Sequence, residues 1–213
     1  MNRYLKGILA GLAGVALLVG GFATASNMGF KFVPNVAASQ AFNLSMPWNN
    51  NFTKANQLFN DLDGQDADLL RLSKFNANST FLNWFAGAAP ANNFNVVKGE
   101  AYILFAAATG PISSAVVVGS HDPNFTFSFT ANQAFNAAAP YHQTFTRANQ
   151  LFNDMNTRLG AGSIQRISKY NPNATFLNWF SGAAPANNFN LDLGMGVIIY
   201  PAQNKTGYVW PHY

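Results

Sequence analysis

The chain has 213 residues and a formal net charge of +4, and charged residues make up only 9% of it. It contains no cysteine, which excludes disulfide bonds, thiol catalysis and zinc–thiolate sites. Lysine and arginine lie singly along the chain, so no basic run could follow a phosphate backbone. We therefore expect no nucleic acid among the partners.

The first 25 residues have the pattern of a secretory signal. The basic start Met1–Lys6 precedes an apolar run from Gly7 to Phe22 and the small residues Ala23-Thr24-Ala25. This run is shorter than the roughly twenty residues that span a bilayer as a helix. We predict a signal peptide over residues 1–25, an uncleaved anchor being the alternative. The mature chain would then be secreted, extracellular or at the cell surface, with no membrane contact of its own.

The remaining sequence contains one unit twice. Phe52 to Leu62 returns as Phe145 to Met155, at an offset of 93, and Thr80 to Phe85 returns as Thr175 to Phe180, at an offset of 95. These offsets exceed the 20–50 residues of most solenoid repeats. We predict two tandem homologous domains, residues 26–121 and 122–213.

Each copy has one amphipathic helix. Apolar residues recur at i, i+3, i+4 and i+7, which places them on one helical face. They are Ala55, Leu58, Phe59 and Leu62 in the first copy and Ala148, Leu151, Phe152 and Met155 in the second. Thr53 and Thr146 stand where an N-cap hydroxyl is expected. Gly64 and Gly160 are expected just past the helix ends.

The rest of each copy has the pattern of short strands bounded by turn residues. The expected strands are 30–33, 42–46, 69–75, 80–85, 101–106 and 116–118 in the first copy, and 125–129, 197–200 and 208–210 with the repeated hairpin 175–180 in the second. Asn92-Asn93 and Asn187-Asn188 are expected to be turn residues. The predicted fold is mainly β (α+β): two tandem homologous domains, each a small antiparallel β-sandwich or roll with one covering helix.

The order of these segments resembles a β-rich domain of uncharacterised secreted prokaryotic surface proteins. That domain has a Trp-Asn-Leu-Ile-Ser-Leu-Pro opening, a helix, an aromatic hairpin and a Gly-x-Gly-Tyr motif. The matching residues are Phe42 to Trp48, then the helix, Trp84, Asn93-Phe94 and Gly99 to Tyr102. Phe42 replaces the opening Trp, and Ala101 replaces the second Gly. The resemblance implies a surface location and a β-rich architecture, and it implies no reaction.

Few side chains could carry catalysis. The histidines, His121, His142 and His212, lie near domain edges or the C-terminus, and the chain has no Gly-x-Ser-x-Gly motif for a hydrolase nucleophile. We expect solvated histidines and predict that the chain is not an enzyme.

One acidic cluster follows the first helix. A loop rich in carboxylates could hold calcium, although the spacing differs from the EF-hand loop. The candidate ligands are Asp61, Asp63, Asp66 and Asp68, and the second copy does not repeat them. A solvated acidic loop is the alternative, and no other cofactor is expected.

The aromatic hairpins are the other candidate site. Trp84, Phe85, Trp179 and Phe180 could stack on sugar rings, whereas large aromatic side chains more commonly pack in a core. Full burial of both tryptophans would exclude the first reading.

Two functions therefore remain. The first is a secreted or cell-envelope structural protein that assembles into a fibre or matrix, with itself or other envelope proteins as partners. Its Phe-rich ends, residues 27–33 or 208–213, would complete a sheet edge of a neighbour. The alternative is a carbohydrate-binding or adhesive module with glycans as partners.

Overall fold

The computed structural model describes residues 30–32 and 34–212, so the predicted signal peptide, residues 1–25, lies outside it. Within these residues no helix is both long and apolar enough to cross a membrane. The first unit contains β1 (Phe30–Phe32), β2 (Ala41–Ser45), α2 (Ala55–Gln65), β3 (Leu69–Phe75), β4 (Phe81–Trp84), the 3-10 turn η1 (Pro90–Asn92), β5 (Ala101–Ala106) and β6 (Val117–Gly119). The second contains β7 (Phe127–Phe129), β8 (Phe135–Ala137), α3 (Ala148–Leu159), β9 (Ile164–Tyr170), β10 (Phe176–Phe180), η2 (Pro185–Asn187), β11 (Val197–Pro201) and β12 (Lys205–Tyr208).

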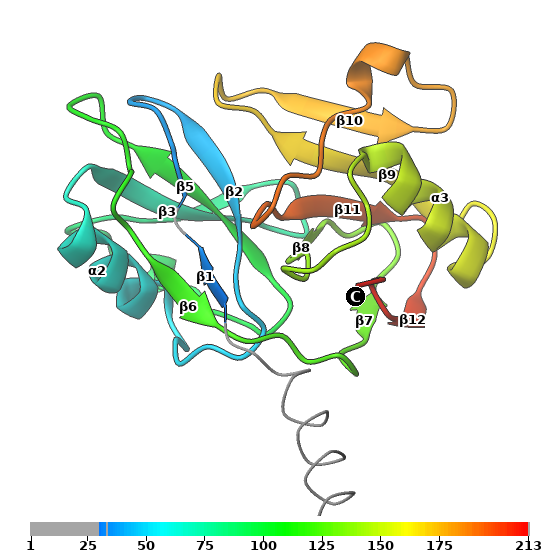
Figure 1. Cartoon of the computed structure of the whole chain (residues 1–213), viewed down its shortest axis with the longest axis horizontal. Coiled ribbons are helices and arrows are strands. Elements are labelled where there is room, and N and C mark those ends of the chain that lie inside the picture. Colours follow the sequence, from blue (N-terminus) through cyan, green and yellow to red (C-terminus); the bar gives the residue numbers. More distant parts are fainter. Residues whose placement is uncertain (1–29, 33, 213) are drawn as a thin grey trace, which may run out of the picture.

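Both units have the same topology. Four strands form an antiparallel sheet, in the order β2-β5-β3-β4 in the first unit and β8-β11-β9-β10 in the second (Figure 1). Each unit also has a two-stranded sheet, formed by β1 and β6 in the first unit and by β7 and β12 in the second. The predicted fold class, two repeated β-rich units with one covering helix each, is confirmed.

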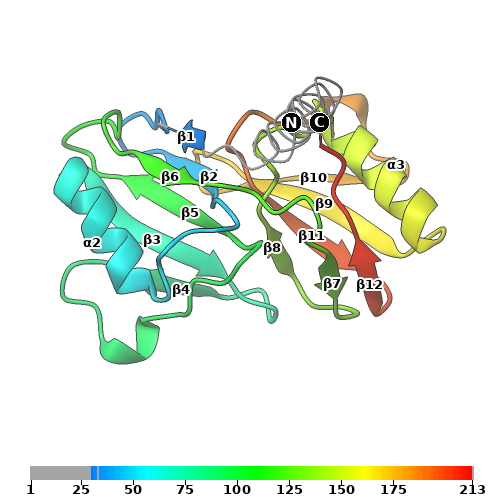
Figure 2. The ribbon, with the colours of Figure 1, turned by 60° about the horizontal axis from the view of Figure 1, so that its bottom comes forward.

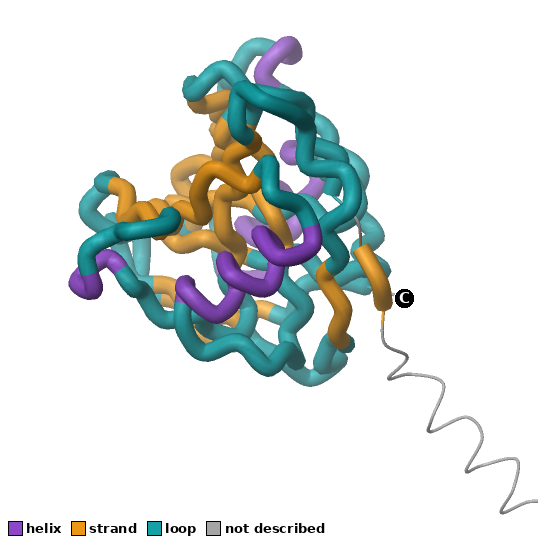
Figure 3. The backbone as a smooth tube through the Cα atoms, turned by 90° about the vertical axis from the view of Figure 1, so that its left-hand side faces the viewer, coloured by secondary structure: helices purple, strands orange, loops and turns teal. Residues whose placement is uncertain are grey.

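The helices lie on the outside of the molecule and the large sheets between them. Figure 2 shows α2 at one side and α3 at the other, with the strands of both sheets in the space between. Seen from the side of the first unit, α2 lies in front of the strands (Figure 3). Each large sheet has a helix on only one face, and its other face is covered by the other unit.

The apolar stripe of each helix is buried as predicted: Leu58 and Leu151 have no exposed surface. The caps differ from the prediction, because Lys54 and Arg147 are the N-cap residues and not Thr53 and Thr146. Gln57 folds back, and its Oε1 accepts hydrogen bonds from the backbone N–H groups of Thr53 (2.8 Å) and Lys54 (3.2 Å). The Thr53 hydroxyl donates to the same oxygen at 3.0 Å. The glutamine thus satisfies donors that the helix leaves unpaired.

The repeated Asn-Asn loop supplies a further cap. Asn93 Oδ1 accepts a hydrogen bond from the Asn56 backbone N–H at 3.0 Å, and Asn188 serves Asn149 in the same way at 3.0 Å. These second asparagines therefore satisfy helix donors in addition to shaping their own turn. In the first unit the two residues of this bond are 37 positions apart in the sequence, so a loop that follows the helix fixes the position of its first turn.

The strands match the prediction closely at 69–75 and 101–106, and less well at the chain ends. Helix α2 runs to Gln65 and so includes Gly64, whereas Gly160 follows α3 with a φ of +102°. The last strand is 205–208 and not 208–210, and its register shifts at Gly207, between Thr206 and Tyr208.

The ends expected to reach a neighbouring copy are already paired within the chain. Residues 30–32 form β1 against β6, and Tyr208 ends β12 against β7. Trp210 is completely buried. Donation of either end to a neighbour would therefore require the β1–β6 or β12–β7 pairing to open first, and it stays a prediction.

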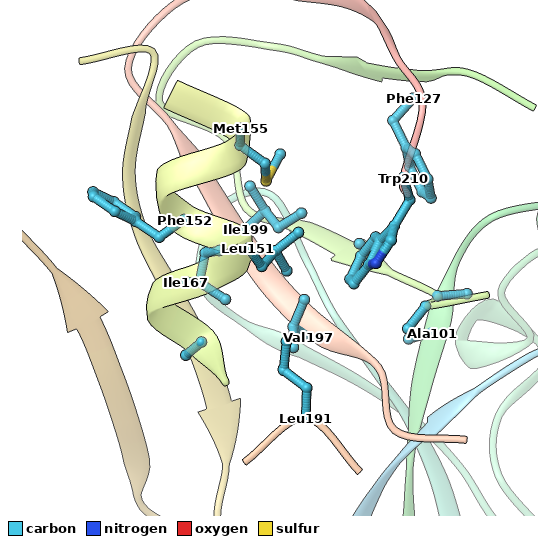
Figure 4. Close-up of a cluster of buried hydrophobic side chains, with 14 of the residues drawn as sticks. Ala101, Phe127, Leu151, Phe152, Met155, Ile167, Leu191, Val197, Ile199 and Trp210 are labelled. Carbon is cyan, nitrogen blue, oxygen red and sulfur yellow. The ribbon is translucent and has the colours of Figure 1, made fainter. Parts of the chain in front are cut away.

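Each unit has its own apolar core, and the second core takes in residues of the first unit. Figure 4 shows Leu151 and Met155 of α3 directed toward Ile199, with Trp210 and Phe127 beside them. Trp48 and Ala101 of the first unit belong to this cluster. The repeats are consecutive in sequence, but their cores are not separate in space.

A pair of buried asparagines joins the units about a pseudo-two-fold axis. Asn43 donates through Nδ2 to the Tyr170 carbonyl (2.6 Å), and its Oδ1 accepts from the Tyr170 N–H (3.1 Å). The equivalent Asn136 of the second unit donates to the carbonyl of Phe75, the equivalent of Tyr170, at 2.6 Å. Both amides are 4% exposed. The interface has the reciprocal form of a two-fold dimer although it lies within one chain.

Backbone groups repeat this reciprocity. The Ser45 N–H donates to the Gly194 carbonyl at 2.7 Å, and the equivalent Ala138 N–H donates to the Gly99 carbonyl at 2.8 Å. The segment before β11 thus covers the β2 edge of the first sheet, and the segment before β5 covers the β8 edge of the second sheet. Two of the sheet edges that could otherwise pair with foreign strands are closed inside the molecule.

Aromatic rings fill the space between the sheets. Phe81 and Phe176, at equivalent positions, stack with centroids 6.4 Å apart and an interplanar angle of 15°. Phe75 meets Phe176 edge to face at 5.2 Å, and Tyr170 meets Phe81 in the same way at 5.4 Å. Near these rings Gly196 faces its counterpart Ala101 so closely that a Cβ at residue 196 would overlap the Ala101 methyl group.

Replacing Asn43 by alanine should lower the free energy of unfolding by about 2–4 kcal/mol, because the buried N–H and C=O of Tyr170 both lose their partner. Urea denaturation of the purified chain measures this change. The exposed Asn95→Ala is the matched control and should stay within about 0.5 kcal/mol of wild type. Equal stabilities for the two variants would contradict the role of Asn43.

Candidate functional site

The aromatic hairpins lie on the outermost strand of each large sheet. Trp84 of β4 is opposite Leu72, and Trp179 of β10 is opposite Ile167. Both tryptophans pack against the core of their unit and are only partly buried. Phe85 and Phe180, which follow them, are each 42% exposed. The condition that would have excluded a sugar-stacking role, full burial of both tryptophans, is therefore not met.

A groove lies between the helix and the hairpin in both units. The groove of the first unit has a volume of about 420 Å³ and is lined by Phe59, Asp63, Ala67, Leu69, Leu70, Arg71, Phe85, Ala86 and Ala107. That of the second has about 720 Å³ and is lined by Phe152, Asn153, Asn156, Thr157, Ala161, Gly162, Ile164, Gln165 and Ser181. Most of the lining positions are equivalent, so the repeated fold creates the same groove twice.

The two grooves differ in chemistry. Leu70, 52% exposed, and Phe85 give the first an apolar wall, whereas Gln165 and Ser181 line the second. Arg71 in the first groove places its guanidinium over the Phe105 ring, 3.8 Å from the centroid. No titratable side chain is among the residues that line the second groove. The residues that line the two grooves provide no nucleophile beside a base.

The acidic loop after α2 is used for folding. Asp66 is buried, and its Oδ2 accepts hydrogen bonds from the backbone N–H groups of Ser113 (2.7 Å) and Ser114 (2.9 Å). Burial opposes ionisation, but these hydrogen bonds with that of the Ser114 hydroxyl keep the pKa of Asp66 below its ordinary value. Asp68 accepts from the Thr109 hydroxyl at 2.8 Å.

The other two acids point elsewhere. Asp61 accepts from the Gln65 side chain at 2.9 Å, and Asp63 lines the first groove. Within residues 30–32 and 34–212, no three His, Cys, Asp or Glu side chains are placed to hold a metal ion. The four candidate calcium ligands are thus neighbours in sequence that the fold does not bring together as a site.

The three histidines, in contrast, converge. The ring of His121 lies with its centroid 5.0 Å from that of His212 and 6.0 Å from that of His142, and Trp48 is 6.3 Å away. His121 is only 6% exposed, so the expectation of solvated histidines is wrong for it. The three rings come from the junction, a loop of the second unit and the C-terminal segment. Nothing in their spacing indicates this convergence.

The environment of His121 disfavours its charged form. Burial is the largest cause that lowers its pKa below the ordinary value of 6.5, followed by the nearby His212 and His142, while Asp122 acts in the opposite direction. Asp122 is itself paired with Lys98 at 2.9 Å. The Nδ1 atom of His121 is buried and has no hydrogen-bond partner among the described residues. The cluster is a packed junction of rings that is sensitive to protonation.

The free energy of unfolding should therefore fall as the pH is lowered from 7 to 5. The pKa of His121 is lower in the folded chain than in the unfolded chain, so below about pH 6.5 the unfolded chain binds the proton first. Denaturant titrations at a series of pH values should show a smaller fall in His121→Gln than in wild type. Identical pH slopes in the two proteins would show that another group is responsible.

The chain matches no family model, no curated protein and no solved structure.

Proposed function

We propose that the chain is a non-catalytic extracellular or cell-envelope structural protein whose copies assemble with themselves into a fibre or matrix. The observation that favours this most is the arrangement of the outer sheet edges. The pseudo-two-fold interface closes the β2 and β8 edges and leaves β4 and β10 as the outer strands of the two sheets. One chain therefore offers two similar edges, which is what a subunit needs to bind neighbours on two sides.

The use of the polar side chains also favours a structural role. Lys74 pairs with Glu100 at 2.6 Å, and Tyr102 donates its hydroxyl to the same carboxylate at 3.1 Å. Burial, with the charge of Glu100, raises the pKa of Tyr102, which keeps the phenol protonated. In the second unit Asp154 accepts from Arg158 and Tyr208, both at 2.9 Å. Groups that could otherwise exchange protons with a substrate thus hold elements of the fold together.

The low charge of the chain fits close assembly. With 9% charged residues, neighbouring copies repel one another only weakly, and salt should change their association little. Export of the chain, which the pattern of residues 1–25 predicts, would place such an assembly outside the cell.

The mature chain, residues 26–213, should form oligomers whose size grows with concentration. Sedimentation velocity over a wide concentration range, followed by electron microscopy of the largest species, measures this. Association at 0.1 M and 0.5 M salt should be similar, because apolar and backbone contacts are screened little. A monodisperse monomer throughout the range would contradict the proposal.

The twin grooves favour glycan binding as a second candidate function. Phe85, which is 42% exposed, lines the first groove, and amides and hydroxyls line the second. Aromatic rings with polar neighbours suit sugar rings, which present both C–H faces and hydroxyl groups.

On this candidate, a glycan array probed with the mature chain should give a defined set of ligands. Affinity for them should fall about tenfold in Phe85→Ala with Trp84→Ala, because one stacking surface is worth roughly 1.5 kcal/mol. Phe180→Ala with Trp179→Ala tests the aromatic hairpin of the second unit, and circular dichroism checks that both variants are folded. Absence of binding to every glycan in the array would rule this candidate out.

A further inference from the structure

Strand β10 pairs with β9 along Phe176–Phe180, and no strand of the described chain pairs with its other side. The one other backbone hydrogen bond that the described residues make to this segment is a turn bond, from the Ala183 N–H to the Phe180 carbonyl at 3.0 Å. β4 is in the same position in the first sheet, along its lower border in Figure 2. Alternate N–H and C=O groups of an outer strand point away from the sheet, and an extended strand is the partner that matches their spacing.

Three of the features that protect a sheet edge are missing from β10. Natural edge strands are guarded by charged side chains, proline or a bulge. The segment Thr175-Phe176-Leu177-Asn178-Trp179-Phe180 has no charge and no proline, and its register with β9 is continuous. Phe180, at its end, is 42% exposed. This composition favours pairing with another uncharged strand.

We infer that two copies of the chain associate through β10, which pairs antiparallel with β10 of the second copy about a two-fold axis at Asn178. This inference rests on the proposed structural function and names its first contact. A second copy supplies a strand that is already extended, so little conformational entropy is lost on pairing.

The sequence of β10 is complementary to itself in this register. Centred on Asn178, antiparallel pairing sets Phe176 opposite Phe180 of the second copy, and Leu177 opposite its Trp179. Side chains that face each other in this way interact directly. Leu177 and Trp179 already pack on the core beneath α3, so the pairing would extend that apolar surface into the neighbour.

Asn178 would lie opposite Asn178 of the second copy at the two-fold axis. Its Oδ1 accepts the Ser168 hydroxyl at 2.7 Å, and Ser168 is fully buried. The Nδ2 group and the second lone pair of Oδ1 are then available for reciprocal amide hydrogen bonds between the two copies. β10 pairs over five residues with β9 and β4 over four with β3, so β10 offers the longer ladder to a partner.

The decisive variant is Asn178→Asp in the mature chain. Aspartate keeps an oxygen for Ser168, and it places two carboxylates opposite each other at the axis. We expect the dissociation constant of the dimer to rise about tenfold or more at 0.05 M salt. It should recover toward the wild-type value at 1 M salt, where the screening length is about 3 Å. Recovery in salt cannot come from a misfolded chain.

The matched control is Asn83→Asp. Asn83 of β4 accepts a hydrogen bond from the Ser73 hydroxyl at 2.7 Å, the same distance as between Ser168 and Asn178. This variant should leave the dimer intact. Mixing Asn178→Asp with Asn178→Lys should restore association that neither variant shows alone, since unlike charges then meet across the axis. The readout is sedimentation equilibrium of each protein and of the mixture.

A chain without cysteine allows a direct check of the contact. Asn178→Cys should give a disulfide-linked dimer on mild oxidation, whereas Asn83→Cys should not. If wild type assembles and Asn178→Asp assembles equally well at low salt, the β10 contact is wrong while the structural function stands. If wild type stays monomeric at every concentration, both fail.

Discussion

The structure depends on two asparagines buried where the units meet. A buried amide without partners would cost about 1–3 kcal/mol, so Asn43 and Asn136 fix which backbone groups of the other unit must lie against them. Their partners, Tyr170 and Phe75, are equivalent residues at the ends of β9 and β3. The two sheets therefore have one relative placement in which both amides reach these partners, and the ring cluster and the crossed edge segments accompany it.

Duplication explains why the interface is reciprocal. A repeated unit that exposes one sheet face and one sheet edge can cover both with its own copy, as a two-fold dimer does. Because the copies are linked in one chain, they can differ at the axis. Residue 101 is Ala, whereas the equivalent residue 196 is Gly, and a methyl group at residue 196 would collide with that of Ala101. Trp48 extends into the core of the second unit and donates to the Ala138 carbonyl at 3.1 Å.

Several positions that the copies share have the same role in the fold of both units. Gln57 and Gln150 cap the helices, and Arg71 and Arg166 lie over the rings of Phe105 and Tyr200 at 3.8 and 3.7 Å. In contrast, the groove linings, the acidic loop and the histidines are not repeated. The duplication thus gives one scaffold with two different surfaces.

The sequence by itself determined the repeat, the buried helix stripes and the strands 69–75 and 101–106, because hydrophobic periodicity is a local property of the chain. Caps were harder to predict, since a glutamine that folds back competes with the threonine beside it. Only the tertiary structure decided what Asn43 and His121 do. Asn43 finds its partner 127 residues away, and the histidines meet where three distant segments cross. No local pattern encodes such contacts, because they depend on how the completed sheets pack.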